Sequence, residues 1–237
     1  MQSRDIGGRE RPETGAGERA FTPALGKSWL TPLYDTAIAL FTREQVWRQA
    51  LVAHIALKPA DRLIDVGCGT GSLLEELWRT CPDAEMVGVE PDPEALAIAK
   101  RKLGSEVTKI RWHNGFLDTL KFDHAWQPTK IVSSLVLHQV PLDQKREILA
   151  LAYRMLAPGG QFLIADYMHQ RNAVMRLLFR VTVQQFDGIR DTQPNADGVL
   201  EKCLSSIFSR AECVARYHTP TGTISIWRAN KEGDHIE

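Results

Sequence analysis

The 237-residue chain is poor in the features that mark secreted, membrane-spanning and nucleic-acid-binding proteins. Its N-terminus has no apolar core of the kind that a secretion signal needs, and no window approaches roughly eighteen consecutive apolar residues. Lysine plus arginine and aspartate plus glutamate both number 29, so the chain lacks the basic excess that favours nucleic-acid binding. We therefore expect a soluble, cytoplasmic protein that has no nucleic-acid partner.

Cysteine is also scarce, because the chain has only four such residues, Cys68, Cys81, Cys203 and Cys213. Their spacings are unrelated and include no CxxC pair, which argues against a zinc site and against a disulfide framework. We expect reduced thiols and no bound metal.

Apolar residues make up 43% of the chain, which is enough for a sizeable core. Residues 1–20 are rich in glycine, arginine and glutamate and predict a flexible tail. Residues 21–60 predict an N-terminal helical cap, because apolar residues recur at helical spacing there, with Asp35 and Thr42 as expected N-caps.

Strands and helices alternate from residue 61 onward. Apolar strands are predicted at 62–67, 86–90, 109–115, 130–138 and 161–167, with amphipathic helices between them. This succession predicts an α/β, Rossmann-like fold whose parallel sheet carries helices on both faces.

The last part of the chain departs from this alternation. Residues 171–210 predict a helical lid insertion over the open side of the site, although the apolar run 174–179 also fits an ordinary core helix. Two final strands, at 211–217 and 223–229, are too close for a parallel crossover and predict an antiparallel hairpin.

The first strand runs into LIDVGCGTG, which buries Asp65 and then places glycine at positions 67, 69 and 71. Glycine lets the backbone turn sharply and lets a ligand approach without meeting a Cβ atom. A dinucleotide-binding loop has the pattern GxGxxG, but Ser72 stands here in place of the third glycine. The loop also lacks the Lys-Ser/Thr pair of a triphosphate-binding loop.

Glu90 ends the second predicted strand, nineteen residues after Gly71. A carboxylate at that position can accept hydrogen bonds from both hydroxyls of a ribose. Glu90 therefore favours an adenosine-containing ligand, while a solvated acid at a strand end is the alternative.

Four segments in order resemble the class I S-adenosylmethionine-dependent methyltransferases: LIDVGCGTG, GVEPDPEAL, IVSSLVLHQVP and MLAPGGQFLIADY. The resemblance covers about residues 30–230 and is greatest to the small-molecule C-methyltransferases of ubiquinone and menaquinone biosynthesis. It implies a methyltransferase core over residues 61–237 with a seven-stranded sheet, in which six strands are parallel and the C-terminal hairpin adds one antiparallel strand. It also implies S-adenosyl-L-methionine as the cofactor.

The resemblance further implies which residues contact the cofactor. Asp65 corresponds to the acid that holds the loop or faces the cofactor's amino group, and Glu90 corresponds to the ribose clamp. Phe116 stands where many relatives have aspartate, so an aromatic contact to adenine replaces a hydrogen bond there. The implied set is Tyr34, Asp65, Gly67, Cys68, Gly69, Gly71, Glu90, Pro91, Asp92, Gly115, Phe116, Leu117, Ser133 and Ser134.

Two members of that set also have simpler interpretations. Cys68 fits a small buried residue that fills the turn. Tyr34 fits an ordinary aromatic that packs a helix, as well as the tyrosine that closes over the cofactor in relatives.

His138 is the expected catalytic residue, because it follows the fourth strand at the edge where the acceptor should lie. Histidine suits general-base chemistry near neutral pH, although a structural role is the alternative. His113 and His169 are weaker candidates, and Asp166 and Tyr167 follow the fifth strand toward the same edge.

The expected reaction is methyl transfer to carbon, oxygen or nitrogen of a small, hydrophobic acceptor resembling a quinone, lipid or polyketide. The absence of an NPPY-type motif after the fourth strand argues against DNA and protein-glutamine acceptors. A tRNA or rRNA methyltransferase on the same fold is the alternative. Arg171, Arg176 and Arg180 fit either a peripheral membrane contact or a solvated face.

Overall fold

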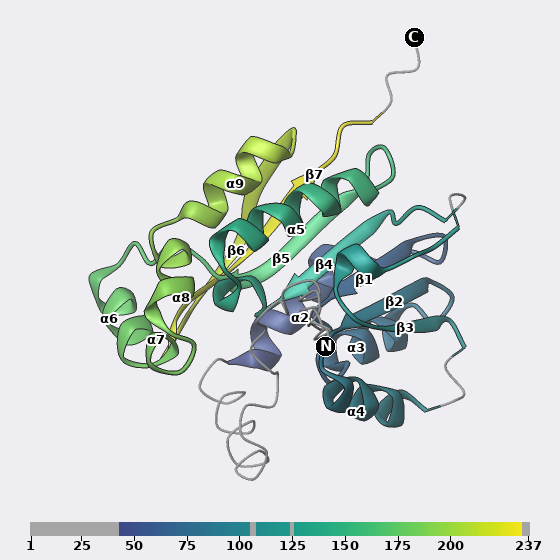
Figure 1. The fold of residues 1–237 in the computed structure, drawn as a ribbon, viewed down its shortest axis with the longest axis horizontal. Coiled ribbons are helices and arrows are strands. Elements are labelled where there is room, and N and C mark those ends of the chain that lie inside the picture. The colour runs from purple at the N-terminus through teal and green to yellow at the C-terminus, as the bar shows by residue number, and fades with distance from the viewer. Residues whose placement is uncertain (1–42, 105–107, 124–125, 234–237) are drawn as a thin grey trace, which may run out of the picture.

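Seven strands form one sheet in the order β3-β2-β1-β4-β5-β7-β6 (Figure 1). The computed structural model describes residues 43–104, 108–123 and 126–233. The strands are β1 (Arg62–Val66), β2 (Glu85–Glu90), β3 (Ile110–Asn114), β4 (Lys130–Ser134), β5 (Gln161–Tyr167), β6 (Arg210–Thr219) and β7 (Gly222–Asn230). β1 to β5 are parallel, and β7 runs antiparallel to both β5 and β6. The predicted sheet of six parallel strands and one antiparallel strand is confirmed.

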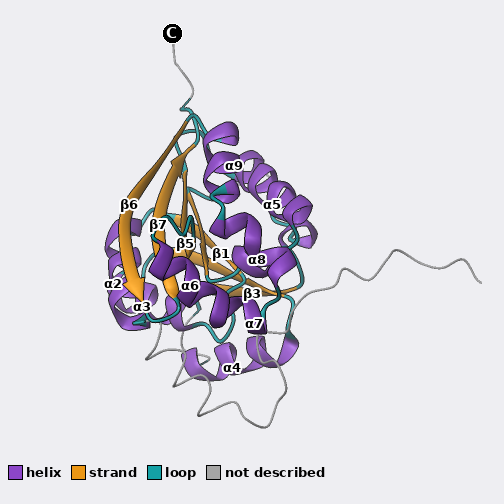
Figure 2. Ribbon diagram, turned by 90° about the vertical axis from the view of Figure 1, so that its left-hand side faces the viewer, coloured by secondary structure: helices purple, strands orange, loops and turns teal. Residues whose placement is uncertain are grey.

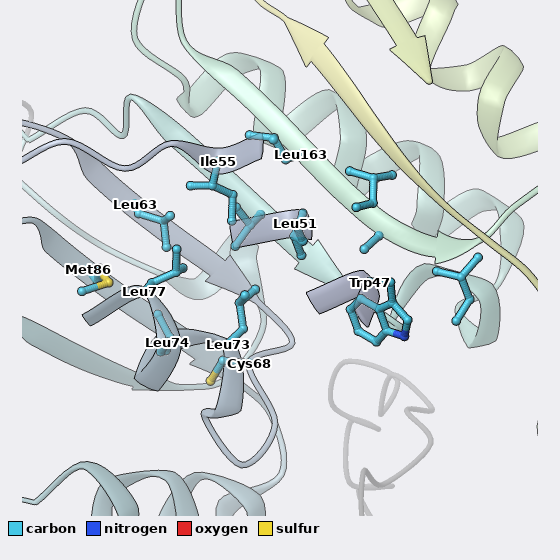
Figure 3. Packing of buried hydrophobic residues seen from close by; sticks show 14 of the residues in the cluster. Trp47, Leu51, Ile55, Leu63, Cys68, Leu73, Leu74, Leu77, Met86 and Leu163 are labelled. Atoms are coloured by element: carbon cyan, nitrogen blue, oxygen red, sulfur yellow. The ribbon is translucent and has the colours of Figure 1, made fainter. Parts of the chain in front are cut away.

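Helices cover both faces of the sheet (Figure 2). One face carries α2 (Glu44–Ile55), α3 (Ser72–Thr80) and α4 (Pro93–Leu103), and the other carries α5 (Leu142–Met155) and α9 (Val199–Ile207). Successive residues of β1 point to opposite layers, so Leu63 packs with α2 and α3 while Ile64 packs with α5. Figure 3 shows the first of these clusters. By the same alternation, Asp65 faces the α2 and α3 layer.

Four helices follow β5, as expected for residues 171–210, but they have two different positions. α6 (Ala173–Val181), α7 (Val183–Phe186) and α8 (Ile189–Ala196) lie together at the left of Figure 1. In contrast, α9 packs against α5 in the regular helical layer. Of these helices, α8 packs against the loop that follows β4.

The fourth strand is shorter than predicted, because it ends at Ser134 and does not continue to His138. Leu135 has a φ of 53°, in the left-handed region that leucine rarely adopts. The amides of Leu137 and His138 then donate to Oδ2 of Asp166, at 2.7 and 3.2 Å. A charged carboxylate is a stronger acceptor than a strand carbonyl, so the chain turns into the short helix η2 (Leu137–Gln139).

Other boundaries agree more closely with the sequence. The hairpin is confirmed, with strands longer than predicted that leave only residues 220 and 221 as the turn. The predicted tail, Tyr34 and the caps Asp35 and Thr42 lie outside the described residues, and α2 is the part of the predicted cap that is described. Within the described ranges, no helix is long and apolar enough to cross a membrane.

Candidate active site

The loop after β1 bends back toward β2 and touches the loop after β4. The amides of Gly67 and Cys68 both donate to the Val89 carbonyl, at 2.8 and 3.1 Å. Gly67 has a φ of 71°, and a Cβ atom there would lie 2.4 Å from Cγ2 of Val136. Any side chain at this position would push the two loops apart, which explains the first glycine of the motif.

The other two glycines of the motif have different surroundings. A Cβ atom on Gly71 would lie 2.9 Å from Cβ of Ala99, so this glycine lets α3 pack closely on α4. A Cβ atom on Gly69 would meet nothing within 4 Å. The space beside Gly69 is therefore open to a ligand, while Gly71 serves helix packing.

Glu90 is held in place at the end of β2, and its carboxylate can accept further hydrogen bonds. Its Oε2 accepts a hydrogen bond from the amide of Gly69 and its Oε1 accepts one from the amide of Asp92, both at 2.9 Å. Burial raises the pKa of Glu90, and these two hydrogen bonds lower it. Each carboxylate oxygen has two lone-pair sites, so a second donor can bind to each.

Asp65 is fully buried, and neither of its carboxylate oxygens has a hydrogen-bond partner among the described residues. Burial and the nearby charge of Glu90 raise the pKa of Asp65 to about 7, while Arg48 lowers it. Buried carboxylates are costly unless they are paired. The two free oxygens therefore fit a ligand that brings a positive charge or hydrogen-bond donors.

Arg48 is part of this site, and the sequence did not indicate it. It projects from α2 and forms ion pairs with Glu44 and, at 3.6 Å, with Glu76 of α3. Burial lowers the pKa of Arg48, while Glu76 and Asp65 raise it. An arginine on an amphipathic helix is normally expected to be solvated. Only the packing of α2 against α3 and the sheet shows that Arg48 interacts with Glu76 and Asp65.

The residues predicted around adenine lie near Glu90, at the ends of β2 and β3. The amide of Gly115 donates to the Glu90 carbonyl at 3.1 Å. Phe116 is half-buried and precedes the short helix η1 (Leu117–Thr119), whose Leu117 is buried in the core. Pro91 offers its carbonyl to the side chain of Asn114 at 3.1 Å.

Three of the predicted contacts have side chains with structural roles. Asp92 caps α4 by accepting from the amides of residues 94 and 95. Ser133 is buried and donates to the Val66 carbonyl at 3.0 Å, whereas Ser134 is half-buried. Burial raises the pKa of the Cys68 thiol, which favours the protonated, packing role.

His138 lies buried between two carboxylates. Its Nδ1 is 2.7 Å from Oδ1 of Asp166, and its Nε2 is 3.3 Å from Oδ2 of Asp187, in the turn between α7 and α8. Burial by itself would lower the pKa of His138, but the two carboxylates raise it to about 9. With this pKa the ring is protonated at neutral pH, and both of its nitrogens face carboxylates.

A second buried link is made by Lys145, which joins α5 to α8. Its Nζ donates to the Asp191 carbonyl at 2.6 Å and to Oδ1 of Asn195 at 2.7 Å. Asn195 in turn donates to the Tyr167 carbonyl at the end of β5, at 2.8 Å. Burial lowers the pKa of Lys145 to about 8. Neither Lys145 nor Asp187 was indicated by the sequence, because each resembles a solvated charge on a helix or turn.

The two weaker histidine candidates lie in other contacts. Nε2 of His113 is 2.8 Å from Oγ1 of Thr119, and Nδ1 of His169 is 3.9 Å from a carboxylate oxygen of Glu201 in α9. Neither contact involves the network around His138.

Comparisons with known proteins agree with this geometry. Residues 63–160 match a family described as "Methyltransferase domain". The chain is 29% identical to a demethylmenaquinone methyltransferase of Thermus thermophilus, over 67% of this chain and 71% of that protein. It is 26% identical to a ubiquinone/menaquinone biosynthesis C-methyltransferase of Dinoroseobacter shibae, over 69% of this chain but less than two thirds, 64%, of that protein. The fold also matches the plantazolicin methyltransferase BpumL, solved with a pentazolic desmethylPZN analogue and S-adenosylhomocysteine (SAH). The TM-score is 0.60, the identity is 15%, and the match covers 86% of this chain and 90% of that one.

The site suits S-adenosylmethionine in three ways. Asp65 presents unpaired oxygens for a positively charged amino group, Glu90 has acceptor capacity for ribose hydroxyls, and the space beside Gly69 is open. With the family match and the named relatives, these features identify the protein. It is an S-adenosylmethionine-dependent methyltransferase, and the chain is similar to the methyltransferases of ubiquinone and menaquinone biosynthesis.

Proposed function

We propose that this methyltransferase acts on a small, hydrophobic, quinone-like acceptor. The observation that carries the proposal is the similarity to proteins named as demethylmenaquinone and ubiquinone/menaquinone methyltransferases. The equal numbers of acidic and basic residues favour a small molecule over RNA as the acceptor.

In this proposal, Asp65 and Glu90 hold two different parts of the cofactor. Asp65 pairs with the amino group through the oxygens that have no partner in the described chain, and Glu90 accepts from the ribose hydroxyls. The bound cofactor supplies an electrophilic methyl group on its sulfonium. The remaining task of the protein is to orient the acceptor and to exclude water.

We assign that second task to α6, α7 and α8. They are tied to the core by two buried links, from His138 to Asp187 and from Lys145 to α8. In this arrangement His138 is a positioning residue, because its pKa of about 9 keeps it protonated at neutral pH. A lid held by the His138–Asp187 ion pair and by the hydrogen bonds of Lys145 keeps a fixed wall beside the acceptor.

A direct assay tests the proposed acceptor. The protein is incubated with isotopically labelled S-adenosylmethionine and either demethylmenaquinone or bulk tRNA, and the products are separated and counted. We expect the label in the quinone and none in the tRNA. Label in the tRNA, or transfer to neither acceptor by protein that binds SAH, would contradict the proposal.

The affinity for SAH is expected to depend on pH through Asp65. The pKa of this carboxyl in the free protein is raised to about 7, so below pH 7 it is protonated and loses its attraction for the amino group. Between pH 8 and pH 6 the dissociation constant should rise about tenfold, as expected for one linked proton. Isothermal titration at several pH values measures this change.

Asp65→Asn is the matched control for this prediction. It removes the titrating group and should bind weakly with a flat pH profile between pH 6 and 8. If the variant shows the same slope as the wild type, another group is responsible and the assignment of Asp65 fails.

A further inference from the structure

Exposed apolar side chains gather on one part of this molecule. Six large hydrophobic residues are exposed in the described part of the chain, and five of them fall between residues 174 and 189. They are Val174, Leu177 and Val181 of α6, Phe186 at the end of α7 and Ile189 at the start of α8, with exposed fractions of 52–70%. We name these five residues the α6–α8 patch. Clustered exposed hydrophobic residues mark interaction surfaces on soluble proteins.

The residues of the α6–α8 patch lie on adjacent surfaces of the three helices. The three residues on α6 are three and four positions apart, so they lie on one side of the helix, while Phe179 on the other side is 1% exposed. A cavity of about 300 Å³ has both Arg180 of α6 and Ile189 of α8 in its lining. The three helices also lie together in Figure 1.

Two arginines beside the α6–α8 patch are available to an external anion. Residues 171–190 contain four arginines and a single carboxylate. Two of the arginines pair with carboxylates further along the chain, Arg171 with Glu201 at 3.9 Å and Arg176 with Asp197 at 2.9 Å. The single carboxylate within residues 171–190, Asp187, is turned toward Nε2 of His138 at 3.3 Å. The guanidinium groups of Arg180 and Arg190 have no ion-pair or hydrogen-bond partner within the described ranges, so they are available to an external anion.

The positive charge of these arginines indicates which partner covers the α6–α8 patch: a second copy of the chain, residues 1–42 or a lipid bilayer. A second copy of the chain would bring the same arginines against one another. Residues 1–42 contain five basic and five acidic residues, so that segment has no negative excess to offer. An anionic bilayer supplies both an apolar interior and negative headgroups. We propose that the α6–α8 patch docks onto an anionic lipid bilayer.

Docking at this surface would place the bilayer close to the acceptor side of the site. The ring of Phe179 in α6 is 5.2 Å from that of Tyr167 at the end of β5, and Tyr167 is 5.1 Å from the ring of His138. A hydrophobic acceptor dissolved in the membrane would then reach the enzyme beside α6. The docking inference goes beyond the proposed acceptor and does not depend on it.

Vesicle sedimentation with the full chain tests the proposal. We expect binding to vesicles that contain phosphatidylglycerol and much weaker binding to phosphatidylcholine alone. The double variant Leu177→Ser, Phe186→Ser should lower the apparent affinity about tenfold or more, because it removes apolar anchors. Arg180→Gln with Arg190→Gln should lower it by about tenfold and reduce its dependence on salt.

Val46→Ser is the matched control, because Val46 is 43% exposed on α2 and lies outside the patch. It should leave vesicle binding unchanged, and all variants should melt at the wild-type temperature because the changed residues are exposed. Three results would overturn the proposal: no binding to anionic vesicles, equal loss in the control, or a wild-type dimer that the double variant dissociates. Vesicle binding needs neither cofactor nor acceptor, so the docking proposal can be contradicted while the proposed methyl transfer is confirmed.

Discussion

Glu90→Gln is expected to weaken SAH binding by about 100-fold, since hydrogen bonds to a charged group contribute about 1.5–3 kcal/mol each. The carboxylate accepts from the amides of Gly69 and Asp92 and is proposed to accept from the ribose as well. Glutamine replaces one oxygen with an amino group, which can accept from neither an amide nor a ribose hydroxyl. The change therefore removes a ligand contact and disturbs the loop that carries Gly69.

Isothermal titration with SAH measures the effect of Glu90→Gln, and Glu85→Gln is its control. Glu85 begins the same strand, at the opposite end from Glu90, and accepts a hydrogen bond from Trp126 on the exposed surface. The control should bind SAH as the wild type does. Affinity of Glu90→Gln within threefold of the control would remove Glu90 from the cofactor site.

Asp166→Asn is expected to lower the free energy of unfolding by about 3–5 kcal/mol at pH 7, the usual cost of breaking a buried ion pair. The Asp166 carboxylate is fully buried and accepts from the amides of Leu137, His138 and Tyr167. It also pairs with Nδ1 of His138. Asparagine at this position leaves the charged, buried imidazolium of His138 beside a neutral side chain. The NH2 group of the asparagine also faces groups that are themselves hydrogen-bond donors.

Chemical denaturation compares this variant with Asp143→Asn. The side chain of Asp143 is 91% exposed and pairs only loosely with Arg146 on the surface of α5, so its loss should be nearly neutral. Equal stability of the two variants would show that the buried network contributes little.

The pH dependence gives a second test of the same network. The pKa of His138 in the folded protein, about 9, lies above its ordinary value of 6.5. Stability from the charged ring is therefore fully present below pH 6.5 and is lost as the pH rises through 9. The difference between wild type and Asp166→Asn should accordingly narrow between pH 6.5 and pH 10, and a constant difference would argue against a charged His138.

Local sequence patterns predicted the sheet well, because each strand or helix is indicated by residues that lie close together in the chain. Alternating apolar strands and amphipathic helices predicted the correct element types, and the short HTPTGT connection predicted the antiparallel hairpin that the structure has. The fourth strand was predicted too long because apolar residues continue beyond Ser133 and Ser134 to Leu137. The strand ends where a carboxylate 29 residues away captures the amide of Leu137, and no window of sequence contains that contact.

The glycine motif and Glu90 could be read directly from the sequence, because a backbone that turns sharply at the end of a strand needs glycine wherever it occurs. The sequence also indicated the cofactor class through four ordered motifs. In contrast, the role of Asp92 as a helix cap and of Ser133 as a link between strands appeared only with their neighbours.

What only the tertiary structure decided is the state of the buried charges. Asp65 is buried without a hydrogen-bond partner among the described residues. His138 lies between Asp166 and Asp187 because segments distant in the chain meet at the carboxyl edge of the sheet. A side chain's pKa depends on its burial and its charged neighbours, and both are set by packing. The sequence by itself determined which cofactor the loop suits, and the fold determined that His138 lies buried between the carboxylates of Asp166 and Asp187.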